Sequence, residues 1–393
     1  MGDYYLEMKN NRKNLFLLYL LFGFVFIGSW FPAMVIYSKI TFDQSGTYFE
    51  SFGILICSII PILLTGNSIA AIISKIGVCK TAILGLLFNG LIALALIFMN
   101  SKIAILLLVA IESVAWSMVY PMRPISIKKL FPNELQNQVV AGISRLRAIS
   151  VIISPPIAAL AIKQWTLGII MLVFSILCIA AIFIVISLCH QVDEYPSLTS
   201  SNGSRNNVFK EFIIHSKPLN IIAGGMFIVI TFDLIYPLYI RDYSTGGLES
   251  FSALLMSFGL GAVFSSIVFR VREAKNSVLW GFLSVGLGLL LYKIITPIPV
   301  EALLIIAFIT GFSSTSVFIS TNTNLQKSPQ FTANTAVAMN MATAVGQLVS
   351  IGLASVIFFF EPNYFFIGVI TIIAVVIVIV PWTLSNFLQF FKR

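Results

Sequence analysis

Four ionisable side chains lie inside long apolar stretches of the sequence and away from the ends of those stretches: Glu112, Arg145, Arg147 and Asp233. A charge in the hydrocarbon core of a membrane costs at least about 2.5 kcal/mol on insertion scales, so each of these residues is a candidate for function. A guanidinium group there binds a carboxylate, phosphate or catecholate through two parallel hydrogen bonds. A carboxyl group there gains or releases a proton when its surroundings change. The chemistry to expect is anion binding coupled to proton exchange.

The two arginines cannot both face one cavity, because residues two positions apart on a helix point about 200° away from each other. Arg147 belongs to a partly polar helical stripe, and the residues 196 positions after this stripe are polar throughout. We therefore predict that Arg147 contacts the ligand and that Arg145 faces a neighbouring helix or extends toward the headgroups. An internal ion pair of Arg147 with Glu112 or Asp233 is the alternative. The later stripe adds three predicted ligand contacts: Asn340, Thr343 and Gln347.

The two acids are the predicted proton-coupling residues. At about 1.5 Å per residue, Glu112 and Asp233 lie about 12–14 Å below the same membrane surface, one in each part of the chain. Burial favours the protonated form of a carboxyl group, and a nearby arginine favours its ionised form. Tyr236 follows Asp233 and is assigned to the ligand site. Thr310 is assigned to the ligand site as well, because Thr310 lies in the region of the second part of the chain that corresponds to the region around Glu112 in the first part.

An aromatic face continues from Glu112. Trp116 and Tyr120 follow it at helical spacing and suit a flat or ring-bearing ligand, with packing at the membrane interface as the alternative. Arg123 continues the same face. We assign Arg123, with the two lysines that follow it, to the charges that fix membrane topology.

The elements that must hold these residues are membrane-spanning helices. Of the 393 residues, 58% are hydrophobic and 10% are charged, and the mean hydropathy of +0.99 lies outside the range of soluble domains. Crossing a hydrocarbon core takes about 20 helical residues, and a chain in lipid must satisfy its own backbone hydrogen bonds. Twelve runs qualify: 14–39, 47–73, 80–99, 103–126, 138–162, 165–189, 217–240, 249–270, 277–296, 299–321, 332–358 and 362–389.

The basic residues orient this arrangement. With the N-terminus in the cytoplasm, most of the 24 lysine and arginine residues fall in cytoplasmic loops and tails. We expect a multi-pass protein of the inner or plasma membrane with both termini cytoplasmic. The net charge of +9 then reflects topology, and no nucleic-acid partner is expected.

The chain divides at a stretch of ordinary polar composition between the sixth and seventh runs. Residues 191–215 are a predicted cytoplasmic linker, and 1–190 and 216–393 each hold six predicted helices. A shift of 196 positions places Gly85 on Gly281 and Gly90 on Gly286. The predicted fold is an all-α polytopic membrane protein with twelve helices in two pseudo-symmetric halves and a substrate site between the halves.

This organisation resembles the major facilitator superfamily. In the family motif between the second and third helices, the second glycine is unchanged here as Gly77, and Ser74 replaces the acid. The residues at the motif positions are Ala70, Ser74, Lys75, Gly77, Val78 and Cys79. The antiporter motif of the fifth helix is represented by small residues around one proline: Ser150, Ser154, Pro155, Ala158 and Ala159. These small residues allow close helix packing, and packing alone is the alternative to a motif of export. The stretch "IGSWFPAMVIYS" and the helix after it look like the branch with enterobactin exporters and macrolide efflux pumps.

The resemblance implies a secondary transporter that exports a small molecule by alternating access. Together with Arg147 and the two acids, it leads us to expect an amphipathic, anionic cargo, such as a siderophore or drug-like metabolite, that is exchanged for protons. Uptake of an anionic nutrient is the alternative, and a polytopic enzyme or a channel is less consistent with the sequence. Both histidines border the linker, and no acid pair is in register for metal or acid-base chemistry. We expect no cofactor and no metal, and we expect a monomer whose partners are its substrate, protons and the lipid bilayer.

Overall fold

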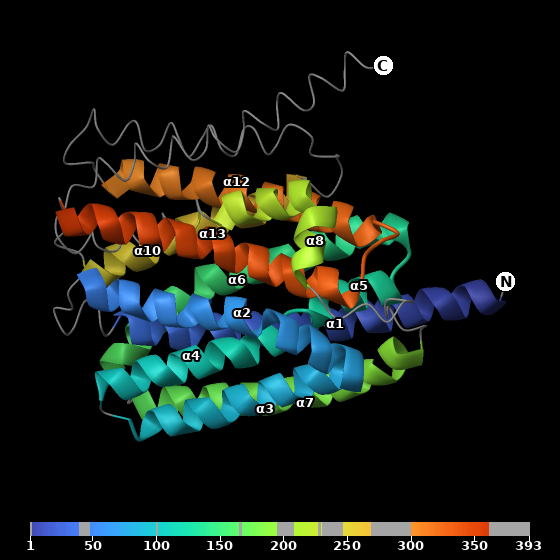
Figure 1. Cartoon of the computed structure of the whole chain (residues 1–393), viewed down its shortest axis with the longest axis horizontal. Helices are drawn as coiled ribbons and strands as arrows, with labels where there is room; N and C mark the ends of the chain where they lie inside the picture. Colours follow the sequence, from blue (N-terminus) through green and yellow to red (C-terminus); the bar gives the residue numbers. More distant parts are fainter. Residues whose placement is uncertain are drawn as a thin grey trace, which may run out of the picture.

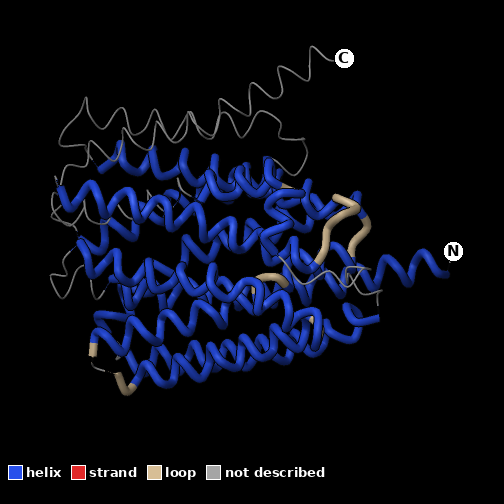
Figure 2. Tube along the Cα trace, in the orientation of Figure 1, coloured by secondary structure: helices blue, strands red, loops and turns tan. Residues whose placement is uncertain are grey.

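The computed structural model describes residues 2–38, 48–99, 101–164, 167–194, 208–226, 229, 247–268 and 300–360. Regular structure in these residues is helical, and the long helices run lengthwise beside one another in one bundle (Figure 1, Figure 2). The helices are α1 (Gly2–Ser38), α2 (Tyr48–Ile76), α3 (Val78–Ile97), α4 (Lys102–Val119), α5 (Met122–Leu130), α6 (Asn133–Gln164), α7 (Leu167–Glu194), α8 (Val208–Ile214), α10 (Gly247–Val268), α12 (Val300–Lys327) and α13 (Ala333–Phe360).

Nine segments of the described chain are long and apolar enough to cross a membrane, and each coincides with a predicted span. Large apolar side chains on the outside of the bundle are exposed, among them Leu64 at 77% and Ile103 at 71%, which is the surface that lipid requires. The chain is therefore a multi-pass membrane protein. The predicted spans 277–296 and 362–389, and most of 217–240, lie outside the described residues, so the count of twelve stays a prediction.

The bundle joins helices from both sides of the predicted linker. Before the linker, α3 packs on α4 and α7, α1 packs on α6 and α7, and α2 packs on α4. After it, α10 packs on α12. The two groups meet where α2 contacts α13 and where α6 contacts α10 and α12. Helices far apart in the sequence therefore enclose one common interior.

Serine hydroxyls connect several of these helix pairs. Ser265 of α10 and Ser316 of α12 share a hydrogen bond of 2.8 Å, and Ser175 of α7 donates to the carbonyl oxygen of Gly90 in α3 at 2.8 Å. Ser113 of α4 donates to the carbonyl oxygen of Ser58 in α2. In lipid there is no hydrophobic driving force for helices to associate, so such hydrogen bonds and close packing hold the bundle together.

Two glycines bring α10 and α12 into backbone contact. A Cβ atom on Gly261 would collide with the carbonyl oxygen of Phe308, and a Cβ atom on Gly311 would collide with that of Phe258. The obstacle in each case is backbone, which cannot rotate aside as a side chain can. The helices lie this close only because both positions lack a side chain.

The fourth predicted span is interrupted. Sequence periodicity predicts one helix over 103–126, whereas α4 ends at Val119 and α5 begins at Met122, with Tyr120 and Pro121 in a turn. Proline has no N–H for the helical ladder and its ring clashes with the preceding turn, so Pro121 ends α4. The directions of the side chains that follow the turn, Arg123 among them, therefore do not follow from the periodicity of α4.

The last part of the predicted linker is helical. Residues 208–214 form α8, and a further helical segment covers 216–226. At the start of α8, the backbone N–H of Val208 donates to Oδ1 of Asn67 in α2 at 3.0 Å. We call the end of the bundle where α8 lies the linker end; the N-terminus of α1 and α5 lie at the same end (Figure 1).

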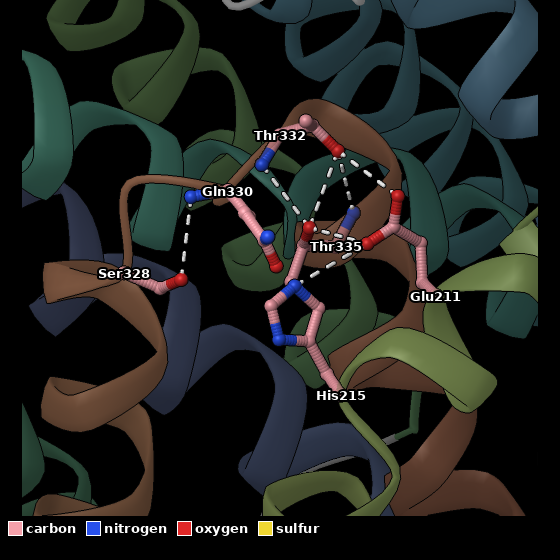
Figure 3. A network of polar contacts seen from close by, with 6 residues as sticks. All are labelled: Glu211, His215, Ser328, Gln330, Thr332 and Thr335. Atoms are coloured by element: carbon pink, nitrogen blue, oxygen red, sulfur yellow. Dashed lines mark hydrogen bonds and ion pairs between the residues drawn. The ribbon is translucent and has the colours of Figure 1, made fainter.

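A network of polar contacts joins α8 to the beginning of α13 (Figure 3). Thr332 and Thr335 cap the first turn of α13 reciprocally, because each backbone N–H donates to the other residue's hydroxyl, at 3.1 and 3.2 Å. Both hydroxyls donate to the carboxylate of Glu211, at 3.4 Å from Thr332 and 2.8 Å from Thr335. Nε2 of His215 lies 3.6 Å from the same carboxylate. The buried negative charge of Glu211 thus lies at the positive end of the helix dipole.

Two further hydrogen bonds cross the linker end. Nζ of Lys128 in α5 donates to the carbonyl oxygen of Ser328 at 3.4 Å, and the hydroxyl of Thr323 in α12 donates to Oδ1 of Asn137 in α6 at 3.3 Å. These two bonds connect segments before and after the linker, and the contact between Val208 and Asn67 connects the last part of the linker to α2. At this end of the bundle, helices before the linker are therefore hydrogen-bonded to segments after it.

We expect Gly311→Ala to lower the free energy of unfolding by about 1–3 kcal/mol, because overpacking must push two backbones apart. Thermal unfolding in detergent measures the effect. Gly352→Ala is the matched control, since a Cβ atom there meets nothing within 4 Å, and it should leave the unfolding temperature unchanged or raise it. Equal effects of both substitutions would contradict the close approach of α10 and α12.

We expect Glu211→Gln to destabilise the protein by about 1–2 kcal/mol, because the amide keeps the shape of the side chain but loses the charge that accepts two hydroxyl hydrogen bonds. Glu301→Gln is the control, since Glu301 is an exposed acid in the first turn of α12. Thermal unfolding should separate the two variants. A loss for Glu301→Gln as large as that for Glu211→Gln would show that helix-end charge alone accounts for the effect.

Candidate functional site

A cavity of about 360 Å³ lies inside the bundle. The described residues that line it come from α1, α2, α4, α5, α6, α10, α12, α13 and the segment after α8. At one end the lining includes Arg123 and Asn322, near the linker end of their helices. At the other it includes Ile36, Ile54 and Phe251, near the opposite end of the bundle. The cavity therefore extends along the interior of the helices and is large enough for a drug-sized molecule.

The face predicted from Glu112 lines this cavity. Nε1 of Trp116 donates to Oε1 of Glu112 at 3.2 Å, which holds the carboxyl group against the indole ring. The rings of Trp116 and Tyr120 are stacked, with centroids 5.8 Å apart and planes 27° apart. Ser29 of α1 lies near the Tyr120 hydroxyl and lines the same cavity. The wall thus combines a titratable carboxyl group with two ordered aromatic rings, which suits a ring-bearing ligand.

Arg147 lines the same cavity from α6. Its guanidinium carbon lies 5.8 Å from the ring centroid of Phe318 in α12, within the range of a cation–π interaction. A second, smaller cavity of about 40 Å³ also contacts Arg147, along with Ser144 and Ser314. Arg147 therefore borders both cavities. Its guanidinium group is oriented by an aromatic ring of α12, a helix that follows the linker in the sequence.

The opposite wall carries neutral polar groups. Asn340, Thr343 and Gln347 of α13 line the cavity at spacings of three and four residues, and Asn322 of α12 joins them. Thr343 donates its hydroxyl to the carbonyl oxygen of Met339 at 3.1 Å in its own helix. Amide side chains both donate and accept hydrogen bonds, so this wall can bind hydroxyl and carbonyl groups of a ligand.

Arg145 lies elsewhere. Its Nε donates to the hydroxyl of Ser266 in α10 at 3.3 Å, and Arg145 is absent from the described lining of both cavities. The helical rotation that separates Arg145 from Arg147 thus turns the first toward a neighbouring helix, as expected, and the second toward the cavity.

Not every predicted site residue reaches the cavity. The hydroxyl of Thr310 donates to the carbonyl oxygen of Ile306 at 2.8 Å in its own helix, and Thr310 is buried among packed helices rather than in the cavity lining. The structure thus places Thr310 outside the described lining of this cavity, because the sequence shift gives the level of a residue along the membrane but not the face of its helix. Asp233 and Tyr236 lie outside the described residues.

The small residues of α6 lie in packed surroundings. Ser150 donates to the carbonyl oxygen of Leu146 at 3.0 Å, Ser154 and Ala158 are buried, and the carbonyl oxygen of Pro155 accepts a hydrogen bond of 3.5 Å from Ser252 of α10. Ala159 belongs to the same helix, and its side chain is outside the described set. The described part of this motif supports packing of α6 on α10 rather than direct contact with the cavity.

The sequence did not predict that Arg123 lies in the cavity. Arg123 was assigned to membrane topology, and in the structure it lines the cavity. The lysines with which it was grouped have other contacts: Lys128 donates to Ser328, and Nζ of Lys129 donates to the carbonyl oxygen of Val192 at 3.1 Å. The signal was present in the helical spacing that links Arg123 to Trp116 and Tyr120. In the described part of the chain, no group of three His, Cys, Asp or Glu side chains could hold a metal ion.

Comparison with known proteins identifies a family for most of the chain. The family model described as Major Facilitator Superfamily matches residues 15–351. The match includes every cavity residue named above. No curated protein matches the chain.

The geometry predicts which side chains water reaches. In a background without the four native cysteines, Thr343→Cys should react with a membrane-impermeant thiol reagent at least about tenfold faster than Thr310→Cys, because the reactive thiolate forms only in contact with water. Labelling followed by mass spectrometry gives the two rates. Val345→Cys is a second control, since it is exposed on the outer surface where lipid excludes the reagent. Similar rates at positions 343 and 310 would contradict the boundaries of the cavity.

Proposed function

The chain belongs to the major facilitator superfamily and is therefore a secondary transporter rather than an enzyme, and on that premise we propose that it exports an amphipathic anionic small molecule in exchange for protons. One observation carries the proposal. Glu112, Arg147, two stacked aromatic rings and a row of amide side chains line a single interior cavity of about 360 Å³. A siderophore or a drug-like metabolite has the required anionic, aromatic and hydrogen-bonding groups.

In this proposal each wall of the cavity binds a different part of the cargo. Arg147 binds the anionic group, with its guanidinium oriented by Phe318. Trp116 and Tyr120 contact the ring of the cargo. Asn340 and the other amide-bearing residues of that wall bind neutral polar groups. In this proposal, access of water to the cavity offsets part of the cost of placing these charges within a membrane protein.

Glu112 is the proposed proton carrier, together with Asp233. Exchange requires that the cargo favour the ionised carboxylate, so that binding of cargo releases a proton. A cargo that offers Glu112 a hydroxyl or ammonium donor has this effect. The indole N–H of Trp116, 3.2 Å from the carboxyl oxygen, already occupies one position on the group and leaves the other oxygen for the cargo.

Uptake with protons is the second candidate, and the shared location of Glu112 and Arg147 favours it for one class of cargo. An anion without a donor group would compete with Glu112 for the positive charge. Binding would then favour the protonated carboxyl group, and anion and proton would move together. The sign of the coupling therefore distinguishes export by exchange from import by symport.

Alternating access is proposed to operate between two six-helix halves, residues 1–190 and 216–393. The hydrogen bonds at the linker end, from Lys128 to Ser328 and from Thr323 to Asn137, support a conformation fastened at that end. Their rupture would open the cavity toward the linker. The concentration of lysine and arginine near this end supports an orientation in which it faces the cytoplasm of the inner or plasma membrane. We propose that the monomer is the transporting unit.

The proposal is tested with purified protein in liposomes. The liposomes are incubated with a small-molecule extract of the expressing cells, under a pH gradient of either sign, and their contents are identified by mass spectrometry. Exchange predicts accumulation of a compound when the interior is acidic, and symport predicts it when the bath is acidic. Protein-free liposomes are the control. Failure of every compound to respond to either gradient would contradict proton-coupled transport.

We expect Glu112→Gln to reduce gradient-driven accumulation of the identified compound to the level of protein-free liposomes, because the amide carries no titratable proton. Exchange of labelled for unlabelled compound without a gradient should persist, since this step needs no net proton movement. Glu134→Gln is the matched control, because Glu134 is exposed in the first turn of α6. Gradient-driven accumulation that survives in Glu112→Gln would remove Glu112 from the coupling mechanism.

A further inference from the structure

We propose that α8 is a lipid-binding element whose outer face enters the boundary between headgroups and acyl chains at the linker end of the bundle, where anionic lipids stabilise it. The partner is the membrane leaflet at that end. This inference goes beyond the proposed function and does not rest on it, because it concerns neither the cargo nor the direction of transport. The level of α8 along the bundle, its orientation and the chemistry of its outer face support it.

α8 is attached to the bundle at the level of the membrane-spanning segments. The side chain of Asn67, which accepts the hydrogen bond from the backbone N–H of Val208, belongs to the candidate span Phe52–Ile76 and lies about 13–14 Å before the end of that span. Glu211 is bound to the first turn of α13, where another candidate span begins. Both partners belong to spans, which places α8 near the boundary of the hydrocarbon core.

α8 runs across the direction of the long helices (Figure 1). A helix that crosses the direction of the membrane spans lies along the plane of the membrane, which is the orientation of helices that bind to its surface. The lipid-facing side of α2 leads to α8, because the exposed Leu64 stands one turn before Asn67. The outer face of α8 thus continues a surface that borders lipid.

The outer face of α8 is apolar. Val208 and Glu211 are buried against the bundle, whereas Phe209, Ile213 and Ile214 are exposed, Ile213 at 79%. Single exposed apolar side chains are ordinary, but a group of three on a helix of seven residues indicates a contact. Acyl chains supply such a contact, since the apolar faces of surface-bound helices enter this boundary by about 5–10 Å.

The charge of α8 fits an anionic leaflet. Lys210 is exposed on the outer face among the apolar side chains, and Lys217 is exposed just after the helix. The acid of α8, Glu211, is turned inward to Thr332 and Thr335. A lysine among apolar groups lays its hydrocarbon stem along them and extends its ammonium group to the headgroups. Near an anionic leaflet each such charge strengthens membrane binding about fivefold.

Lipid binding at α8 has a structural consequence, because α8 connects segments on the two sides of the linker. The N–H of Val208 is bonded to α2, before the linker, and Glu211 is bonded to α13, after it. A helix of seven residues does not form by itself, so a partner that binds the folded helix also stabilises these two attachments. Anionic lipid therefore stabilises the conformation in which α8 joins α2 to α13.

The location of α8 is tested by fluorescence quenching on the full-length protein, in nanodiscs that hold one chain each. In a background without the four native cysteines, the same fluorophore is attached to Ile213→Cys, to the lipid-facing Leu64→Cys and to Gln330→Cys, which is exposed in the turn before α13. Lipids with a nitroxide on the acyl chain should quench Ile213→Cys and Leu64→Cys at least about threefold more than Gln330→Cys. Iodide in the water should quench Gln330→Cys most.

The role of anionic lipid is tested by hydrogen exchange of the backbone amides of α8. Exchange in the wild-type protein should be about fivefold slower in nanodiscs that contain phosphatidylglycerol than in nanodiscs of phosphatidylcholine alone, because lipid binding stabilises the folded helix. Lys210→Gln should remove this difference. Lys80→Gln is the matched control and should keep it, since Lys80 is an exposed lysine in the first turn of α3, away from α8.

Two results of the quenching experiment would overturn the location of α8. Quenching of Ile213→Cys by iodide and not by lipid would place its face in water, and protection from both quenchers would show that another part of the protein covers it. Equal exchange in the two lipids, or an equal effect of Lys210→Gln and Lys80→Gln, would overturn the role of anionic lipid. None of these measurements uses cargo or a proton gradient, so a failure of the proposed function leaves them unaffected.

Discussion

Charged side chains inside a helical membrane bundle are unfavourable unless water, a partner group or a ligand compensates them, and this cost governs the interior of the protein. Glu112, Arg123 and Arg147 all meet the condition by lining one cavity. The helices around them can be almost wholly apolar because the polar groups are gathered there. The charged side chains thus need the cavity, because it exposes them to groups that can compensate their charge. The surrounding helices enclose this cavity.

The helix α6 shows how one element satisfies several constraints. Arg147 faces the cavity, Arg145 is hydrogen-bonded to Ser266 of α10, and the buried Ser154 and Ala158 belong to the stretch that packs on α10. A helix places these functions on different faces simply through its rotation per residue. The same helix therefore supplies a charge to the site and a contact between segments on either side of the linker. Movement between those segments would necessarily move the arginine.

The features that depend on local periodicity could be predicted from the sequence. Nine spans follow from runs of apolar residues, and the location of Arg147, Trp116 and Gln347 on one cavity follows from helical spacing. The structure places Thr310 outside the described lining of the cavity, because correspondence between repeats does not specify which face of α12 a residue occupies. The cavity position of Arg123 was not predicted, because its place near the end of a span also suits a topology charge and Pro121 interrupts the helix before it.

The short helix α8 could not be foreseen for a different reason. Seven residues are too few to be stable as an isolated helix, so its formation depends on tertiary contacts such as those of Glu211 and Val208. No pattern within a polar linker encodes partners that lie more than a hundred residues away in the chain. The polar composition of the linker therefore predicts a flexible segment, although the last turn of the linker is anchored in the fold.

This anchoring has a mechanical consequence. Glu211 is hydrogen-bonded to the first turn of α13, and Asn340, Thr343 and Gln347 follow along the same uninterrupted helix over about 8–18 Å. A helix of that length is stiff, so a displacement of α8 moves α13 as a single unit. The hydrogen-bonding groups of α13 that line the cavity are thereby connected to the position of a short helix at the linker end.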